Sequence, residues 1–587
     1  MKLITKSVTI LFLIFISFYN SLLITPLFEQ TTTNPYQIIG PTTEQNYNPQ
    51  NNTIRYLLVT LGTIITSYGL YILDKKHQIK YINVFIVLIV TTSFTLSQVT
   101  TFNQKVGNID MFHDGEQLGV GSAIQFFNKH PFTEMFFLHG YFADPGIALL
   151  SFNLFGTSIG SFYFLNTLFV IISFLLLIGI LSMIIKDRFL FITLSFYLIA
   201  GSTIFSFSRD LLTFLFILLI FLVSTKKISL FKGLYLSTLI TSFNFLYSLD
   251  RAYYTFAANG LFIFITGLSY ITKKNNLQKI QHILKIVFPT TLAISTTTII
   301  AIIFFGWKAF QEFFIITFFK IPQMKPFLDE YAFPKLIITS LFPYWIPIIL
   351  IIGSTLLSLH YATKTKWNSL SPFLITINIL ALLYYRSAIG RSDLHHITYV
   401  FHIIVIAAII TGSIILTSQK STTTKLLVYI LASAIFLLPY INYQKLFLPP
   451  TYKVDDIIQF ITLFDTKDER WISAEQQAVS TYISQNTSNN DYIFVYTNES
   501  VYYYLFNRQN PTRFYTIWFA SPNYYQQEVI NDLQKNKPKL IIYKSSFWSN
   551  KIDNIPNEKR LPIIEKWIKN NYIYDKTILS TEILKQK

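Results

Sequence analysis

The sequence predicts an α-helical polytopic membrane protein with about 13 transmembrane helices and a small C-terminal α/β domain. Hydrophobic residues make up 52% of its 587 residues and charged residues only 13%, against about 25% charged in an ordinary soluble domain. Apolar stretches of about 20 residues, long enough to cross a bilayer, recur through residues 1–443. From residue 444 onward the composition is that of a soluble domain. These features exclude a soluble globular enzyme, a disordered chain and a fibrous repeat protein.

The first 443 residues form the predicted transmembrane domain. Its spans lie near residues 7–28, 55–73, 81–100, 160–185, 189–207, 211–224, 233–249, 253–271, 286–304, 336–358, 370–385, 397–417 and 426–443. Lys2 and Lys6 precede the first span, and no small-residue cleavage site follows it. This pattern predicts a membrane anchor rather than a removed signal peptide.

Basic residues in short loops predict the orientation of the spans. If the spans alternate, one side receives the loops Asp74-Lys75-Lys76, Lys186-Asp187-Arg188, Lys226-Lys227, Lys273-Lys274, Lys364-Thr365-Lys366 and Lys420. Loops rich in Lys and Arg face the cytoplasm. We therefore expect a cell-membrane protein with a cytoplasmic N-terminus and an extracytoplasmic C-terminal domain.

The net charge of +17 does not indicate a nucleic-acid partner. Residues 1–450 hold 30 Lys and Arg against 15 Asp and Glu, whereas residues 451–587 hold 17 against 15. The basic excess therefore belongs to the membrane part, where it sets topology. The chain has no cysteine, which excludes disulfides, thiolate metal sites and a cysteine nucleophile.

Two predicted outer loops, 101–159 and 305–335, are too long to be simple connections. The first contains an amphipathic stretch over Gly119–Phe127 and an aromatic turn around His139, so we expect it to lie at the membrane surface. The second carries Trp307, Phe327 and Tyr331 as interfacial anchors.

The C-terminal domain, residues 444–587, alternates strand-like and helix-like segments. Asp491–Tyr496 and Lys539–Tyr543 are predicted strands, and Ser473–Ile483 and Tyr524–Lys535 are predicted helices. Such alternation favours a small α/β domain.

An acidic cluster opens the first outer loop. Asp110, His113, Asp114 and Glu116 lie within seven residues. A carboxylate held in a fixed loop can take the proton from an attacking hydroxyl. Asp114 is equally well explained as a helix N-cap, with Gln117 completing a capping box, and both roles can hold together.

A second set of charged residues stands at the outer ends of the spans. It comprises Arg209, Asp210, Asp250, Arg251, Arg386, Arg391, Asp393, His395 and His396. The planar fork of arginine suits phosphate oxygens, which points to a lipid-linked phosphate. Alternatively, these are interfacial charges that pair locally with the nearby aspartates.

We predict no metal ligands from the sequence. Asp393, His395 and His396 lack the spacing of a known site, and adjacent histidines do not easily face one ion. A divalent cation on a pyrophosphate would need only carboxylates, so a metal requirement stays open.

These features together resemble the GT-C superfamily of integral membrane glycosyltransferases. The resemblance rests on the acidic motif 113–116 in the first large outer loop, the many spans and the outward tail. Within the tail, residues 498–514 and 533–542 resemble stretches of the bacterial protein O-mannosyltransferase-like branch. In this chain the acidic loop follows the third span instead of the first, which two extra N-terminal spans would explain.

The resemblance implies a hexosyltransferase-like enzyme of the cell envelope. It implies a polyprenyl-phosphate sugar donor, a glycan, lipid or protein acceptor, and an inverting single displacement at the outer face. The base maps best onto Asp114, with Glu116 next, while Arg209, Arg251 or Arg391 would hold the phosphate. Asp210, Asp250 and His395 complete the predicted substrate site.

Two other functions stay open. A lipid-linked polysaccharide polymerase or ligase would use the same location and the same arginines. A lipid or sugar transporter would instead place charges in mid-membrane and carry paired broken helices.

Overall fold

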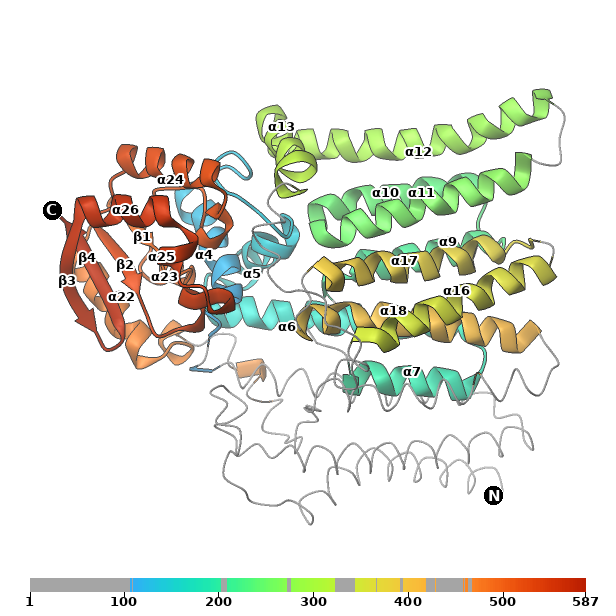
Figure 1. Cartoon of the computed structure of the whole chain (residues 1–587), viewed down its shortest axis with the longest axis horizontal. Helices are drawn as coiled ribbons and strands as arrows, with labels where there is room; N and C mark the ends of the chain where they lie inside the picture. The colour runs from blue at the N-terminus through green and yellow to red at the C-terminus, as the bar shows by residue number, and fades with distance from the viewer. Residues whose placement is uncertain are drawn as a thin grey trace, which may run out of the picture.

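The computed structural model describes residues 106–107, 109–201, 208–271, 276–322, 344–365, 367–390, 394–418, 428, 458, 460–462 and 467–587. The predicted spans at 7–28, 55–73 and 81–100, most of 426–443, and the predicted boundary at residue 444 lie outside them. Long helices form a bundle, an α/β domain covers one end of it, and a layer with α4 and α5 lies between the two (Figure 1). We call this end of the bundle the domain end.

Within the described residues, nine helices of the bundle coincide with predicted spans. They are α6 (Ile159–Ile184), α7 (Arg188–Gly201), α9 (Leu211–Ser224), α10 (Leu230–Tyr247), α11 (Leu249–Ile271), α12 (Asn276–Phe305), α16 (Ile346–Lys364), α17 (Ser371–Gly390) and α18 (Leu394–Ser418). Segments of α6, α12, α16 and α18 are long and apolar enough to cross a membrane by themselves, and α9 is a shorter apolar helix. The chain is therefore a multi-pass membrane protein.

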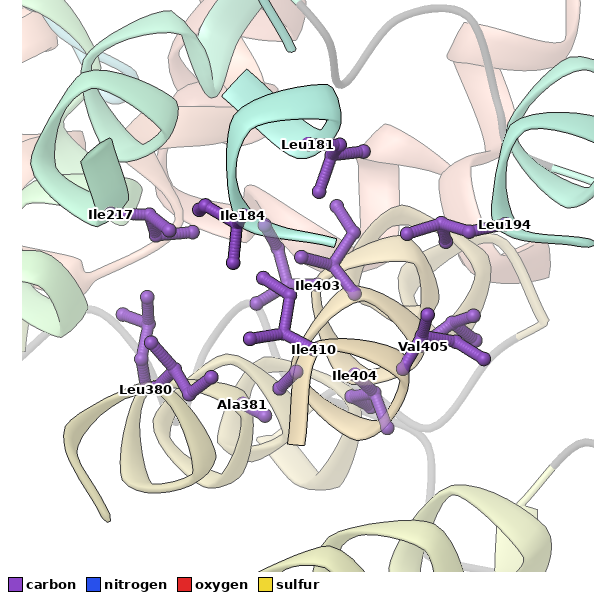
Figure 2. Packing of buried hydrophobic residues seen from close by; sticks show 14 of the residues in the cluster. Leu181, Ile184, Leu194, Ile217, Leu380, Ala381, Ile403, Ile404, Val405 and Ile410 are labelled. Atoms are coloured by element: carbon purple, nitrogen blue, oxygen red, sulfur yellow. The ribbon is translucent and has the colours of Figure 1, made fainter. Parts of the chain in front are cut away.

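Helix α18 lies at the centre of the bundle and α12 at its edge. Of the most apolar window in each helix, 89% is buried in α18 but only 28% in α12. Figure 2 shows α18 side chains packed among residues of α6, α7, α9 and α17; the labelled residues are Ile403, Ile404, Val405, Ile410, Leu181, Ile184, Leu194, Ile217, Leu380 and Ala381. Apolar side chains exposed on α12, such as Ile303, are those that lipid would cover.

The first outer loop is folded into helices. It contains α4 (His113–Phe127), a π-helical turn η2 (Phe142–Gly146) and α5 (Ile147–Phe155). The predicted amphipathic stretch forms the second half of α4. Part of the second outer loop forms α13 (Trp307–Ile315) and a π-helical turn η3 (Ile316–Lys320), while Phe327 and Tyr331 lie outside the described residues.

The C-terminal domain contains a four-stranded sheet in the order β1-β2-β4-β3. Its strands are β1 (Ile493–Val495), β2 (Leu540–Lys544), β3 (Tyr572–Ile578) and β4 (Thr581–Gln586). Strands β1 and β2 are parallel, with Ile493 opposite Leu540, and both β2–β4 and β3–β4 are antiparallel.

Helical segments surround this sheet. They are η5 (Asp468–Arg470), α22 (Ala474–Asn486), α23 (Val501–Leu505), η6 (Ile517–Ala520), α24 (Asn523–Lys535), η7 (Trp548–Asn554), α25 (Asn557–Arg560) and α26 (Pro562–Asn571). The predicted strands 491–496 and 539–543 are confirmed as β1 and β2, and the two predicted helices are confirmed as α22 and α24. A capping box of Ser473 and Gln476 begins α22.

Candidate functional site

The acidic motif forms the start of α4, and the Asp110 side chain, two residues before the N-cap Phe112, binds backbone N–H groups at this end of the helix. Oδ1 of Asp110 accepts hydrogen bonds from the backbone N–H groups of Phe112 and His113, each at 3.0 Å, and Oδ2 lies 3.0 Å from Nδ1 of His113. Asp114 lies inside the first turn. The predicted capping box of Asp114 and Gln117 is therefore wrong, because the helix begins one residue before Asp114 and Asp110 satisfies the first N–H groups.

Asp114 faces α6 and the C-terminal domain. The carboxylate is buried, and its Oδ2 accepts a hydrogen bond of 2.6 Å from the hydroxyl of Tyr163 near the start of α6. The ring of Tyr163 packs against Trp471, with centroids 5.2 Å apart. This aspartate therefore joins α4 to α6 where the domain begins.

Glu116 faces a different side of α4. Two residues along an α-helix correspond to a rotation of about 200°, so Glu116 points away from Tyr163. It is also buried, and its Oε2 lies 3.9 Å from Nδ1 of His139.

His139 and Gly140 dock the outer loop onto the corner between α10 and α11. The carbonyl of His139 accepts a hydrogen bond of 2.7 Å from the N–H of Leu249. Gly140 has φ +110°, and a Cβ atom here would lie 3.1 Å from both the Leu249 nitrogen and the Tyr247 oxygen. Both the backbone angle and the close approach require glycine at this position.

Four helices of the bundle meet around the buried carboxylate of Asp210, which precedes α9. Nε of Arg251 in α11 lies 2.9 Å from Oδ1, and Nε2 of His402 in α18 lies 2.7 Å from Oδ2. The hydroxyl of Tyr384 in α17 donates to Oδ1 at 2.9 Å. Because a buried charge is costly unless it is paired, Asp210 links α9, α11, α17 and α18.

Asp250 connects this cluster to the outer loop. Its Oδ2 lies 2.9 Å from Nη1 of Arg251, and its Oδ1 accepts a hydrogen bond from Ser248. The Asp250 side chain is 31% exposed, whereas that of Arg251 is 4% exposed. Asp250 also lies within electrostatic range of Arg209 and His139.

Two groups of ionisable side chains thus lie near each other at the domain end. Glu116 pairs with His139, Asp250, Arg251, Asp210 and His402 form the second group, and His139 is within electrostatic range of Asp250. The two constellations predicted from sequence, which are far apart in the chain, meet here. Asp250 and His139 are partly exposed, at 31% and 28% of their side chains, whereas Glu116, Arg251, Asp210 and His402 are buried.

The structure brings some of the predicted site residues together and leaves others undescribed. Asp210, Asp250 and Arg251 form one cluster with Arg209 beside it, and Glu116 approaches this cluster through His139. Arg391 lies outside the described residues, as does the side chain of His395, whose backbone is in the first turn of α18.

Sequence reasoning missed Tyr163, Tyr384 and His402 as partners of the predicted aspartates. His402 had a usable signal, since an ionisable residue inside an apolar span is costly and usually has a partner. Tyr163 and Tyr384 had no such signal, because they are two of 37 tyrosines in the chain. Within the part of the chain that the structure describes, no three His, Asp or Glu side chains are grouped to hold a metal ion.

The C-terminal domain packs directly on α4. Ideal Cβ atoms at Gly115 and Gly119 would each lie 2.6 Å from a backbone atom of the domain, the Val501 nitrogen and the Ser500 oxygen respectively. The two glycines, one helical turn apart, let α23 approach the helix that carries the acidic motif. The stretch 498–514 that resembles glycosyltransferase tails thus includes the contact with α4.

Two carboxyl groups lie near this contact, Asp468 partly exposed and Glu499 buried. Asp468 accepts hydrogen bonds from the Ile159 N–H at 2.8 Å and the Tyr504 hydroxyl at 2.6 Å, so it ties the start of α6 to α23. Burial raises the pKa of Glu499 to about 7, and the charge of Glu475 adds to the effect.

Comparisons with known proteins give one kind of match. No protein-family model matches the chain, and no curated protein matches it. The crystal structure of ArnT from Cupriavidus metallidurans bound to undecaprenyl phosphate is similar at 11% identity and a TM-score of 0.47, over 85% of this chain and 97% of that one. The apo form of the same protein gives 11% identity and a TM-score of 0.45 over the same shares. Neither similarity assigns a function to this chain.

Proposed function

We propose that this chain is a membrane glycosyltransferase that moves a sugar from a polyprenyl-phosphate donor to an acceptor hydroxyl. One observation carries the proposal: Glu116 of the docked outer loop pairs with His139, and His139 lies within electrostatic range of the Asp250–Arg251–Asp210 cluster at the domain end. Sugar transfer needs a carboxylate base and a site for phosphate, and the sequence resemblance supplies the donor class.

The orientation of the chain is part of the proposal. Asp468 fixes the start of α6 at the domain end, so the loop after α6, with Lys186 and Arg188, lies at the opposite end. Asp210 and Tyr384 similarly place the beginning of α9 and the end of α17 at the domain end, which puts Lys226 and Lys364 at the other. Basic loops face the cytoplasm, so the domain is extracytoplasmic.

Glu116 is the base that the geometry favours. Asp114 is occupied by Tyr163 on the side of α6, whereas Glu116 faces His139 and, through it, Asp250. In the reaction, the acceptor O–H gives its proton to the carboxylate as the oxygen bonds to the anomeric carbon. The bond from that carbon to the phosphate oxygen breaks on the opposite side, its electron pair leaves with the polyprenyl phosphate, and configuration inverts.

Arg209 and Arg391 are the arginines proposed to hold the phosphate. Arg251 is almost completely buried between Asp210 and Asp250, so its charge is already neutralised by carboxylates. We assign it the role of holding Asp250 in place. Contacts from a phosphate-binding arginine strengthen as negative charge develops on the leaving group, which is where binding lowers the barrier.

The test measures transfer of a radiolabelled hexose from a synthetic polyprenyl phosphate in proteoliposomes that contain extracts of lipid and glycan acceptors. We expect Glu116→Gln to lower the rate by about 10²–10⁴. Asp114→Asn keeps an oxygen that accepts from Tyr163, so we expect it to lose less than about tenfold. Glu134→Gln is the matched control. It replaces a glutamate of the same outer loop by glutamine, but Glu134 pairs with Lys129 instead of His139.

Each outcome decides a different point. Loss of transfer in Asp114→Asn but not in Glu116→Gln would return the role of base to Asp114. Transfer that survives both substitutions would refute a carboxylate base on α4. A parent protein that accepts only a pyrophosphate-linked glycan would be a polymerase or ligase, and donor movement across the bilayer without transfer would indicate a transporter.

A further inference from the structure

Two aromatic side chains are exposed together where the domain meets α4. The imidazole of His113, the first residue of α4, is 56% exposed, and Trp548, the first residue of η7, is 47% exposed. Their rings are stacked, with centroids 5.6 Å apart and an interplanar angle of 30°. Covering the exposed apolar surface of this tryptophan with a ligand would contribute hydrophobic free energy to binding.

Phe112 and Asp110 hold the two rings in place. Phe112 is buried beneath it, with ring centroids 4.8 Å from His113 and 5.2 Å from Trp548. The Asp110 carboxylate lies 3.0 Å from Nδ1 of His113, which fixes the imidazole plane. Both rings therefore present a prearranged surface, which we call the aromatic platform.

The platform combines an apolar face with acceptors at its edge. An indole face attracts the weakly positive C–H bonds of an adjacent group. When the Nδ1–H of His113 donates its hydrogen bond to Asp110, Nε2 is an acceptor, and the Asp110 carboxylate oxygens are further acceptors beside it. A sugar ring has the complementary pattern, with C–H bonds on one face and hydroxyl donors around its rim.

We propose that the aromatic platform binds a sugar ring of the acceptor, so that the acceptor is a glycan. This inference rests on the proposed function. His113 and Glu116 are three residues apart on α4, and such residues lie on neighbouring parts of one helix surface, about 5–6 Å apart. The platform therefore lies on the part of the α4 surface next to the one that carries the proposed base.

The experiment measures binding without a donor, so it does not depend on transfer. Full-length protein in nanodiscs is mixed with mannotriose, cellotriose or chitotriose, and saturation-transfer difference NMR reports which ring protons contact the protein. We expect at least one trisaccharide to bind through its C–H face. Trp548→Ala should weaken binding at least tenfold and His113→Ala several-fold, while Trp548→Phe should retain part of it.

Trp367→Ala is the matched control, because Trp367 is similarly exposed but lies in the loop between α16 and α17, at the end of the bundle opposite the domain. Thermal unfolding of each variant checks that it folds. The proposal is overturned if none of the three trisaccharides binds the parent protein, or if Trp548→Ala binds as the parent does. Glu116→Gln should still bind the trisaccharide, so failure of the proposed function leaves this result distinct.

Discussion

Replacing Gly115 by alanine should separate the C-terminal domain from the acidic helix. The added Cβ would lie 2.6 Å from the Val501 nitrogen and 3.1 Å from the Val501 Cβ. An ordinary contact begins at 3.4 Å, so α23 must retreat by about 0.8 Å from α4 to relieve the overlap. Because the nearest atom belongs to the backbone, a side-chain rotation does not relieve it.

The expected cost follows from two opposing terms. Overpacking of a tight contact costs about 1–3 kcal/mol, and the backbone clash places Gly115 toward the upper end. Alanine in place of glycine within a helix returns about 1 kcal/mol. We therefore expect Gly115→Ala to destabilise the contact by about 2 kcal/mol.

The assay is thermal unfolding of the full-length protein in detergent, combined with limited proteolysis of the C-terminal domain. Gly179→Ala in α6 is the control, because nothing lies within 4 Å of its Cβ position and the change should leave stability unchanged or raise it. If Gly115→Ala unfolds and resists protease as Gly179→Ala does, the reasoning that α23 braces α4 is refuted.

Three further predictions concern polar groups. Burial raises the pKa of Glu499 from 4.5 to about 7, so between these pH values the folded protein keeps a proton that the unfolded chain loses, and stability falls as pH rises from 4.5 to 7. Glu499→Gln should remove this fall, which is worth about 3 kcal/mol. The measurement is the free energy of unfolding at pH 5 and pH 8. An unchanged pH dependence would contradict it. Asp468→Ala removes the acceptor of the Ile159 N–H and of the Tyr504 hydroxyl, and should lower stability by about 1–3 kcal/mol in chemical denaturation, whereas a loss below about 0.5 kcal/mol would count against the bridge. Tyr384→Phe removes a donor to buried Asp210 and should cost about 1–3 kcal/mol in the same measurement; parent-like stability would show that Asp210 does not depend on it.

Much of the architecture is predictable from local sequence. Apolar stretches predict the helices of the bundle because lipid leaves backbone groups no other partner, and α9 matches its predicted limits of 211–224. Strands β1 and β2 are predictable because each is a short run of β-branched and aromatic residues. The β3–β4 hairpin was missed because β3 is mostly exposed and carries Asp575 and Lys576, so it lacks an alternating apolar pattern.

The site was predictable in its members but not in their pairing. Charges beside apolar spans identified Asp210, Asp250 and Arg251, since such residues are costly without a function or a partner. Which carboxylate of α4 faces that cluster depends on tertiary packing, namely on Gly115 and Gly119 against the domain and on the docking of Gly140. No local pattern encodes those contacts.

The acidic start of α4 can meet the Asp210–Asp250–Arg251 cluster only if the outer loop docks at the corner between α10 and α11. A disulfide tests this docking directly. The chain has no cysteine, so the double variant His139→Cys, Leu249→Cys gives no background. The backbone oxygen of residue 139 and nitrogen of residue 249 are 2.7 Å apart, which places their Cα atoms within the roughly 4.4–6.8 Å that a disulfide spans. The control pair, Trp367→Cys with Leu249→Cys, joins opposite ends of the bundle.

Mild oxidation in native membranes, followed by mass spectrometry of the linked peptides, is the measurement. Docking predicts a disulfide between residues 139 and 249 and none in the control pair. Reduced thiols in the 139–249 variant, under conditions that oxidise an exposed cysteine pair of a reference protein, would show that the acidic helix and the buried arginine cluster do not meet.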